Sequence, residues 1–244
     1  MIASMAATPT ILPLVLDGVA LVAGGVPIID GISAEIAAGA RSVILGANGA
    51  GKSVLLRLCH GLLRPTAGRI VWHGANGSDP ARRQAMVFQR PVMLRRSALA
   101  NIIYALKLAR MPRNERTARA HEALARAGLA GLADRSARVL SGGEQQRLAL
   151  ARVWALEPEV LFLDEPTASL DPAATRAVEA IIEAIHLTGT KIVMTTHNLG
   201  QARRLADEIL FLHRGRLVER IAADRFFAGP ATPEGAAFLR EEMP

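Results

Sequence analysis

Residues 46–53 read Gly-Ala-Asn-Gly-Ala-Gly-Lys-Ser, between an apolar run at 42–45 and a second one that begins at 54. This order fits the P-loop pattern, in which a strand leads through a glycine-rich turn into a helix. Glycine frees the backbone so that successive N–H groups converge on an anion, and the helix that follows adds the positive end of its dipole. An ordinary glycine-rich turn is the alternative, but the whole pattern arises by chance in only about one chain in a hundred of this length. The stretch therefore predicts a nucleotide phosphate site.

Two side chains of the P-loop have defined chemical roles. The Lys52 ammonium is expected to reach the β- and γ-phosphates, and the Ser53 hydroxyl is expected to ligate Mg²⁺. The residues predicted to bind the nucleotide phosphates all belong to the turn or to the first positions after it: Gly46, Asn48, Gly49, Ala50, Gly51, Lys52, Ser53 and Val54.

The composition agrees with an α/β fold. Half of the 244 residues are hydrophobic and only 4% are aromatic, so Leu, Val, Ile and Ala must form the core, as in parallel strands covered by helices. A single cysteine, Cys59, excludes an internal disulfide, and its place in the helix predicted after the P-loop favours a buried thiol. The six histidines lack metal-ligand spacing, so we expect no zinc site. No uncharged apolar run is long enough to cross a membrane, so we expect no membrane span.

The formal net charge of +7 is compatible with several kinds of partner. Nucleic acid and an anionic membrane face are both acidic surfaces that a basic chain could meet, and a solvated arginine-rich surface is the simplest alternative. The arginines spread over several predicted helices and form no block. Charge alone therefore does not choose among these readings.

Apolar periodicity divides the chain into α/β portions on either side of a helical insert at about 91–139. Helical spacing recurs at 97–110, with Ser97 as its predicted cap, and at 114–127. The strands predicted from short apolar runs are an antiparallel pair within 14–36 and further strands at 42–45, 69–73, 85–88, 160–163, 191–195, 208–212 and 216–219. We expect one domain over residues 1–244, with a helical subdomain at about 91–155 and a short C-terminal extension at about 221–244.

Asp164 and Glu165 directly follow the apolar run at 160–163. They would lie at the C-terminal end of a strand, where ligands bind in open α/β sheets. In a P-loop protein the first acid holds Mg²⁺ directly or through its water, so Asp164 is predicted as a metal-site residue. Glu165 can then orient the attacking water as general base. A solvated strand end is the usual fate of an isolated Asp-Glu pair, and the P-loop upstream makes it the weaker reading here.

Further motifs occur in the order found in ABC ATPases. Residues 140–146 resemble the signature sequence of that family, Gln89 the Q-loop, residues 169–171 the D-loop and His197 the switch histidine. With the P-loop and the acidic pair, the resemblance covers about residues 14–220, and the chain is identified as a member of that family. The resemblance implies a P-loop NTPase fold with a mixed sheet core, an N-terminal antiparallel β portion and a helical subdomain. It also implies ATP and Mg²⁺ as cofactors.

The resemblance further implies a mechanism built from two copies of the chain. The copies pair head to tail, and each ATP lies between the P-loop of one copy and the signature helix of the other. The residues implied to act across this dimer are Ser141, Gly142, Gly143 and Glu144, with Asp171 at the dimer seam. Catalytic roles fall to Glu165, His197, Lys52 and Gln89, and the metal site comprises Ser53, Gln89 and Asp164.

The chain departs from the family pattern where an aromatic residue usually stacks on adenine. Alignment of residues 16–19 with the family's first strand puts Ala23 at that position. We therefore expect weaker base affinity and selectivity, or packing of Val22 or Val26 on the purine. The signature also carries Glu144 where glutamine is commoner, and this change removes no phosphate or metal contact.

The resemblance favours the energy subunit of a prokaryotic importer, peripheral to the cytoplasmic face of the inner (plasma) membrane. Residues 88–106 look like the ATPases of tungstate-type oxyanion importers, and next like those of phosphate importers, so the expected solute is an oxyanion such as tungstate, molybdate or phosphate. Residues 88–97 would receive a cytoplasmic helix of the permease. The implied partners are a second copy of the chain, permease subunits and, indirectly, a solute-binding protein, with no nucleic acid.

Three alternatives stay open. The first is an importer of another solute, such as an amino acid. The second is an ABC ATPase that acts on DNA or ribosomes, although such proteins usually carry a long coiled-coil insert or two ATPase domains in one chain. The third is a degenerate module that binds nucleotide without hydrolysis, which the presence of Lys52, Asp164, Glu165 and His197 argues against.

Overall fold

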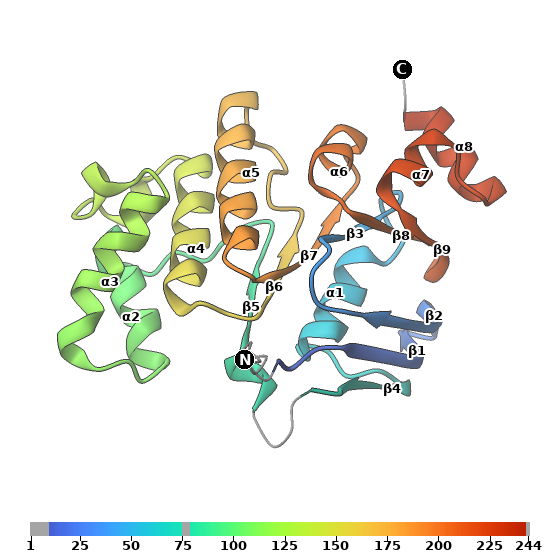
Figure 1. Ribbon diagram of the computed structural model, residues 1–244, viewed down its shortest axis with the longest axis horizontal. Coiled ribbons are helices and arrows are strands. Elements are labelled where there is room, and N and C mark those ends of the chain that lie inside the picture. Colours follow the sequence, from blue (N-terminus) through green and yellow to red (C-terminus); the bar gives the residue numbers. More distant parts are fainter. Residues whose placement is uncertain (1–9, 75–78, 243–244) are drawn as a thin grey trace, which may run out of the picture.

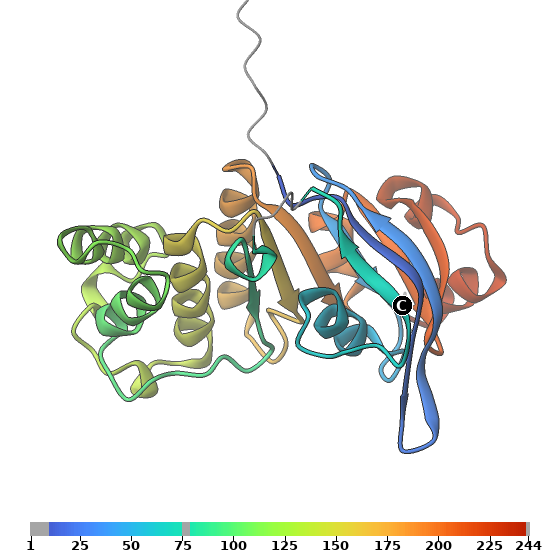
Figure 2. The ribbon, with the colours of Figure 1, turned by 90° about the horizontal axis from the view of Figure 1, so that it is seen from below.

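Two β-sheets and a group of helices make up residues 10–74 and 79–242, which the computed structural model describes (Figure 1). The smaller sheet is antiparallel and has three strands in the order β2-β1-β4. These strands are β1 (Leu14–Ala23), β2 (Val26–Ile36) and β4 (Ala67–Trp72). Gly24 and Gly25, both with positive φ, close the β1–β2 hairpin, whose tip projects from the molecule in Figure 2. The predicted antiparallel pair is confirmed.

The larger sheet has six strands in the order β5-β6-β7-β3-β8-β9. All neighbouring strands are parallel except β8 and β9, so the predicted mixed sheet is confirmed. The strands are β3 (Ser42–Leu45), β5 (Gln84–Val87), β6 (Val160–Asp164), β7 (Lys191–Thr196), β8 (Glu208–His213) and β9 (Arg216–Ala222).

Helix α1 (Lys52–His60) lies between the two sheets. Its buried Leu56 and Cys59 belong to one apolar cluster with Ile32 of β2 and Phe162 of β6. Burial raises the pKa of the Cys59 thiol to about 12, in agreement with the predicted buried thiol. Because β3 leads directly into this helix, the turn between them is held at the carboxyl edge of the parallel strands.

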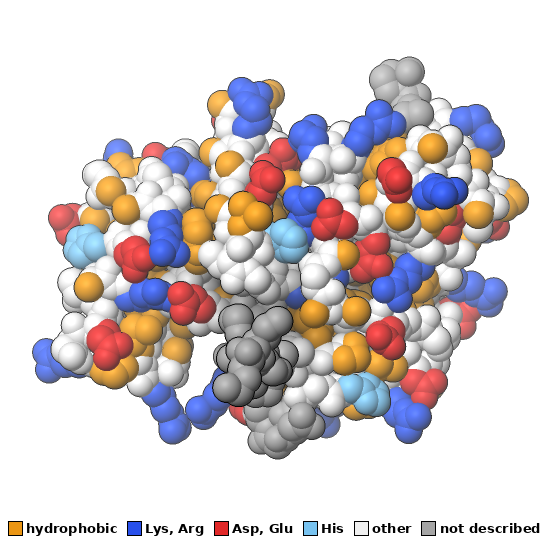
Figure 3. Space-filling view, in the orientation of Figure 1, with side chains coloured by type: hydrophobic (Ala, Val, Ile, Leu, Met, Phe, Trp, Pro, Cys, Tyr) orange, Lys and Arg blue, Asp and Glu red, His pale blue; other side chains and the backbone are white. Residues whose placement is uncertain are grey.

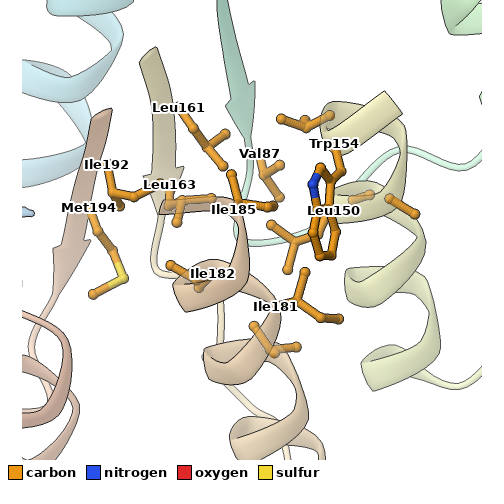
Figure 4. Packing of buried hydrophobic residues seen from close by; sticks show 14 of the residues in the cluster. Val87, Leu150, Trp154, Leu161, Leu163, Ile181, Ile182, Ile185, Ile192 and Met194 are labelled. Carbon is orange, nitrogen blue, oxygen red and sulfur yellow. The ribbon is translucent and has the colours of Figure 1, made fainter. Parts of the chain in front are cut away.

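A second apolar cluster fills the opposite face of the larger sheet. Helices α4 (Gly142–Leu156) and α5 (Pro172–Leu187) cover this face, and α6 (Leu199–Leu205) lies beside them. Figure 4 shows the side chains that meet in this layer: Leu150 and Trp154 of α4, Ile181, Ile182 and Ile185 of α5, and Val87, Leu161, Leu163, Ile192 and Met194 of the strands. Apolar side chains thus pack against both faces of the larger sheet and fix the positions of its strand ends.

The helical insert comprises α2 (Ala98–Leu108) and α3 (Arg113–Arg126), which pack with α4 at one side of the molecule. Ser97 caps α2, since its hydroxyl accepts the Ala100 N–H at 3.2 Å, as predicted. Single turns of 3-10 helix occupy Pro80–Arg82, Ala130–Leu132 and Ala137–Val139.

The buried strand predicted at 85–88 differs from the structure at its end. The β5 strand stops at Val87, which pairs with Leu163 of β6, and Phe88 is 37% exposed. Phe88 lies past the last paired position of a strand at the sheet edge, so its ring is covered only in part. The apolar run in the sequence is therefore one residue longer than the strand, and its last residue, Phe88, is partly exposed at the surface.

On the face shown in Figure 3, lysine and arginine side chains alternate with acidic ones and form no continuous basic area. Among the described residues, no helix has both the length and the apolar character needed to cross a membrane.

One buried carboxylate holds the segment between the last two helices, α7 (Ala223–Ala228) and α8 (Pro233–Glu242). Glu219 of β9 is 8% exposed and accepts hydrogen bonds from Ala231 N at 2.8 Å, Thr232 N at 3.3 Å and Thr232 Oγ1 at 2.8 Å. These bonds tie the segment before α8 to the sheet.

We expect Glu219→Ala to lower the free energy of unfolding by about 1–3 kcal/mol, because three part-buried hydrogen bonds to a charged group are lost. Amide hydrogen exchange should accelerate in α8 while the P-loop helix α1 stays protected. Unchanged protection of α8 would contradict this role of Glu219.

Candidate functional site

Two glycines allow the turn between β3 and α1 to form. A Cβ on Gly46 would lie 2.2 Å from the carbonyl oxygen of Leu212, so no side chain fits there. Gly51 has a φ of +100°, and its Cβ would lie 2.9 Å from Ile29 Cδ1. The turn is therefore pressed against β2 and β8 and ends at the N-terminus of α1, where free N–H groups favour an anion.

The Lys52 ammonium folds back over this turn. Its Nζ donates to the carbonyl oxygens of Gly46 at 2.8 Å and Ala47 at 3.0 Å, and it lies 3.7 Å from Glu165 Oε1. Lys52 is 5% exposed, so water screens its charge only weakly. The structure thus brings the predicted lysine and the predicted general base to the same place.

Ser53 and Asp164 form a pair of oxygen donors beside the turn. Ser53 Oγ donates to Asp164 Oδ1 at 2.6 Å, and Thr195 Oγ1 donates to the same oxygen at 2.9 Å. The other carboxylate oxygen lies 3.4 Å from an Arg57 guanidinium nitrogen. A hydroxyl and a carboxylate next to a phosphate cradle match the preference of Mg²⁺ for oxygen ligands. No cluster of three or more His, Cys, Asp or Glu side chains suited to a metal occurs in the described part of the chain, and a Mg²⁺ shared with phosphates requires none.

Glu165 and His197 lie at the carboxyl ends of the neighbouring strands β6 and β7. Glu165 Oε2 is 3.2 Å from His197 Nδ1. Glu165 adopts a left-handed φ of +44°, and its N–H donates to the hydroxyl of Thr195 at 3.0 Å and to the Thr195 carbonyl at 3.2 Å. Non-glycine residues in this conformation are concentrated at functional sites, where neighbouring bonds hold them.

Glu165 and His197 share the lining of a pocket of about 340 Å³ with Gln89, which follows β5. The remaining lining residues come from the segment after Glu165 and from the start of α5 and α6: Thr167, Ala168, Ser169, Leu170, Thr175, Thr196, Asn198, Gln201 and Arg204. The structure therefore gathers all the catalytic residues predicted from the sequence around the carboxyl edge of the larger sheet.

The signature residues lie elsewhere, at the N-terminus of α4. Ser141 and Glu144 form a capping box: the Glu144 N–H donates to Ser141 Oγ at 3.4 Å, and Glu144 Oε2 accepts from Ser141 N at 2.8 Å. The Ser141 hydroxyl also donates to Glu144 Oε2, at 2.9 Å, and the bonds from the Ser141 backbone N–H and from this hydroxyl lower the pKa of the Glu144 carboxyl. Ser141 and Gly142 are exposed. The helix end thus presents its free N–H groups at the surface.

The D-loop residue Asp171 is adjacent to the signature. Its Oδ1 caps α5 by accepting the N–H groups of Ala173 at 2.8 Å and Ala174 at 2.9 Å, and these bonds lower the pKa of its carboxyl. A Cβ on Gly143 would lie 2.7 Å from Ala174 Cβ. The N-termini of α4 and α5 therefore pack in direct contact, and both face outward.

The hairpin position aligned with the family aromatic carries no ring. Ala23 ends β1 and is exposed, and the neighbouring Val22 and Val26 are 47% and 57% exposed. Farther back along β2, Ile28 and Ile29 border Gly51 of the turn. The β1–β2 hairpin thus extends away from the P-loop turn, and the side chains at the position of the family's aromatic residue are all aliphatic.

Sequence reasoning missed Arg57, Gln201 and the contacts of Thr195. Thr195 pairs with Asp164 in the register between β6 and β7. The two polar residues that follow the apolar run at 192–194, Thr195 and Thr196, were the available signal.

The chain was compared with known proteins. The family model described as "ABC transporter" matches residues 29–168. The tungstate uptake system ATP-binding protein TupC of Peptoclostridium acidaminophilum is 40% identical over 205 residues, which cover 84% of this chain and 94% of that protein. The methionine import ATP-binding protein MetN of Caulobacter vibrioides is 38% identical over 231 residues, covering 89% of this chain and 69% of that protein.

A solved structure has the same fold. The ATP-binding cassette MJ0796, determined as a dimer in a post-hydrolysis state with ADP and Pi, superposes with a TM-score of 0.76 at 27% identity. The match covers 86% of this chain and 98% of that one. The fold class predicted from the sequence is confirmed by this similarity.

Proposed function

Because this chain belongs to the ABC transporter family, we propose that it is the ATP-hydrolysing subunit of a membrane importer. One observation carries the enzymatic part of the proposal: the Glu165 carboxylate lies beside both the P-loop lysine and His197. The transport part is supported by relatives whose names describe import or uptake. The proposed position is peripheral, at the cytoplasmic face of the inner (plasma) membrane.

In the proposed mechanism, the P-loop binds the phosphates of ATP. The backbone N–H groups of residues 46–54 and the Lys52 ammonium hold the β- and γ-phosphates. Ser53 and Asp164, with Gln89 from the segment after β5, would hold Mg²⁺, which would supply positive charge to the phosphates.

Hydrolysis is assigned to the residues at the ends of β6 and β7. The Glu165 carboxylate accepts a proton from the attacking water, and the Lys52 ammonium lies 3.7 Å from Glu165 Oε1. His197 orients Glu165 from the other side and contacts the γ-phosphate. A module that binds nucleotide without hydrolysis would not require Glu165, Lys52 and His197 to lie close together.

The proposed active unit is a head-to-tail dimer. The exposed N-terminus of α4, with Ser141, Gly142, Gly143 and Glu144, would approach the γ-phosphate bound to the other copy, and Asp171 would lie at the seam. The dimeric MJ0796 structure supports this arrangement.

A groove on the helical side is the proposed permease contact. Its volume is about 330 Å³, and it is lined by the segment after β5 together with α2 and the end of α4. Val92 and Leu108 on its rim are 71% and 66% exposed, which is unusual for such large apolar side chains. Arg152 lies within the groove and donates to the Val92 carbonyl at 2.9 Å. These features fit an amphipathic helix supplied by a permease subunit.

The proposed solute is an oxyanion of the tungstate, molybdate or phosphate type, delivered by a solute-binding protein. Support comes from the relative named for tungstate uptake, 94% of whose length is covered by the match with this chain. The methionine relative keeps an amino acid as the second candidate solute, and an ABC ATPase that works without a permease is the alternative of a different class.

The test is a mild-detergent pull-down of the tagged chain from its native membranes, with mass spectrometry of the co-purified proteins. A multi-span permease is the expected result. Its solute-binding protein, titrated with tungstate, molybdate, phosphate and methionine, would then identify the solute. Recovery of ribosomes or DNA-repair proteins without a permease would contradict the importer proposal.

We also propose that the chain forms one ATPase domain with a helical subdomain at about 91–155 and a C-terminal extension from about 221. The packing of α2 and α3 against α4 supports the subdomain. The outer limits at 1 and 244 lie outside the described residues.

The missing adenine-stacking ring leads to a prediction about base affinity. We expect Ala23→Tyr to lower the KM for ATP about two- to tenfold, since stacking of aromatic rings contributes about 0.5–1.5 kcal/mol. The kcat should stay unchanged, because the phosphate contacts are unaffected. Steady-state kinetics with ATP and GTP measures this effect, and identical KM values for variant and parent would show that the base does not bind at this hairpin.

A further inference from the structure

Two separate loops carry Glu165 and His197. The first runs from Glu165 to Asp171 and folds into consecutive turns, with Ala168 N donating to Glu165 O at 3.1 Å and Leu170 N to Thr167 O at 3.2 Å. The second joins β7 to α6. Because each loop holds one partner of the Glu165–His197 contact, the distance between the loops decides whether that contact forms.

One side chain joins the two loops. Gln201 of α6 is 2% exposed, and its Nε2 donates to Thr167 Oγ1 at 2.7 Å. At the same time its backbone N–H donates to Asn198 Oδ1 at 2.8 Å, next to His197. The Gln201 residue therefore contacts both the loop that bears His197 and the loop that bears Glu165.

A buried carboxylate fixes the orientation of this glutamine. Glu179 of α5 is 7% exposed, and its Oε1 lies 3.4 Å from Gln201 Nε2. Arg204, one turn after Gln201, binds both oxygens of Glu179, at 2.9 Å and 2.7 Å. This bidentate ion pair holds α6 against α5. The Gln201 amide is thereby oriented so that it donates to Thr167 Oγ1. Buried hydrogen-bond networks of this kind specify one arrangement of the groups that they join.

We propose that Gln201 is a positioning residue for hydrolysis, which acts through Thr167 to set the distance between Glu165 and His197. The proposal rests on the function proposed above, in which Glu165 is the base and His197 orients it. Neither Gln201 nor Thr167 contacts the P-loop in this scheme, so the bridge governs the chemical step and leaves ATP binding alone. It also connects His197 to the segment that ends at Asp171.

The test compares Thr167→Val, Gln201→Met and the double variant with the parent chain. Thr167→Val removes the acceptor at nearly constant shape, and Gln201→Met removes the donor. We expect each single variant to lower kcat about tenfold with the KM for ATP unchanged within about twofold, because misplacement of a catalytic group affects the transition state alone. The double variant should lose no more than either single one, since both changes break the same bond.

Two controls separate positioning from a general loss of stability. Thr167→Ser keeps the hydroxyl and should retain the parent kcat. Arg203→Gln changes an exposed residue of the same helix whose guanidinium lies over the Phe227 ring, and it should also retain the parent kcat. The two Thr167 variants decide the case even where Gln201→Met reduces the yield of folded protein.

The proposal is overturned by a parental kcat in Thr167→Val, by an equal loss in Thr167→Ser, or by additive losses in the double variant. Glu165→Gln in the same assay distinguishes a failure of the positioning proposal from a failure of the proposed function. If Glu165→Gln stops turnover while Thr167→Val does not change it, the positioning role alone is wrong. If Glu165→Gln retains turnover, the proposed catalytic assignment is wrong.

Discussion

Glu165→Gln is expected to lower ATP turnover by about 10²–10⁴-fold, because an amide cannot accept the proton of the attacking water. The side chain keeps its shape, so its neighbours Lys52 and His197, at 3.7 Å and 3.2 Å in the parent chain, should stay in place. The lysine then still holds the phosphates. ATP should therefore bind and, with hydrolysis blocked, hold the two copies together.

The measurements are phosphate release and light scattering with and without ATP. The parent chain should release phosphate and return to monomers, whereas Glu165→Gln should accumulate as a dimer. Glu183→Gln provides a matched control, because it makes the same chemical change at an exposed position of α5. Parental turnover in Glu165→Gln would remove this residue from the role of general base.

Gly143→Val has the second large expected effect. The Cβ of any side chain here would lie 2.7 Å from Ala174 Cβ, so the N-terminus of α4 must move away from α5. Because that helix end is proposed to reach the γ-phosphate of the other copy, we expect the loss of both ATP-dependent dimerisation and turnover. ATP binding by the P-loop of the same chain should remain, since residues 46–54 lie in a different part of the fold.

Equilibrium binding of a fluorescent ATP analogue, followed by light scattering, separates these two outcomes. Gly131→Val is the matched control, because a Cβ at Gly131 would meet no atom within 4 Å and the substitution belongs to the same helical region. Dimers and turnover should survive that change. Normal turnover in Gly143→Val would contradict the proposed role of the signature helix.

The position of the glycine-rich turn before α1 and that of the acidic pair at the end of β6 could be predicted because both are local patterns. Each lies at the end of an apolar strand, and the spacing of glycine, lysine and hydroxyl residues in 46–53 depends on no distant contact. The cap at Ser97 was equally predictable, since a capping residue bonds only within its own helical turn.

The bridge from Gln201 to Thr167 could not be predicted, because it depends on which strands are neighbours. The sequence order of β6 and β7 does not reveal that Asp164 pairs with Thr195, nor that α6 returns to the loop after Glu165. The end of β5 was misjudged for a related reason: Phe88 is apolar, but its position at the sheet edge leaves it for a surface groove. The apolar character of a residue does not show whether its side chain lies in the core or in a groove at the surface.

The shared active site of the dimer is tested most directly by mixing two inactive variants. Lys52→Ala disables the P-loop and Gly143→Val disables the signature, so each alone should have no turnover. In a mixed dimer, the P-loop of the second variant faces the signature of the first, and one complete site forms. The account predicts that an equal mixture recovers up to about half of the parent rate, because only mixed dimers are expected to form with ATP and each of them has one of two sites intact. A mixture that stays inactive would contradict the claim that two copies of this chain build each site.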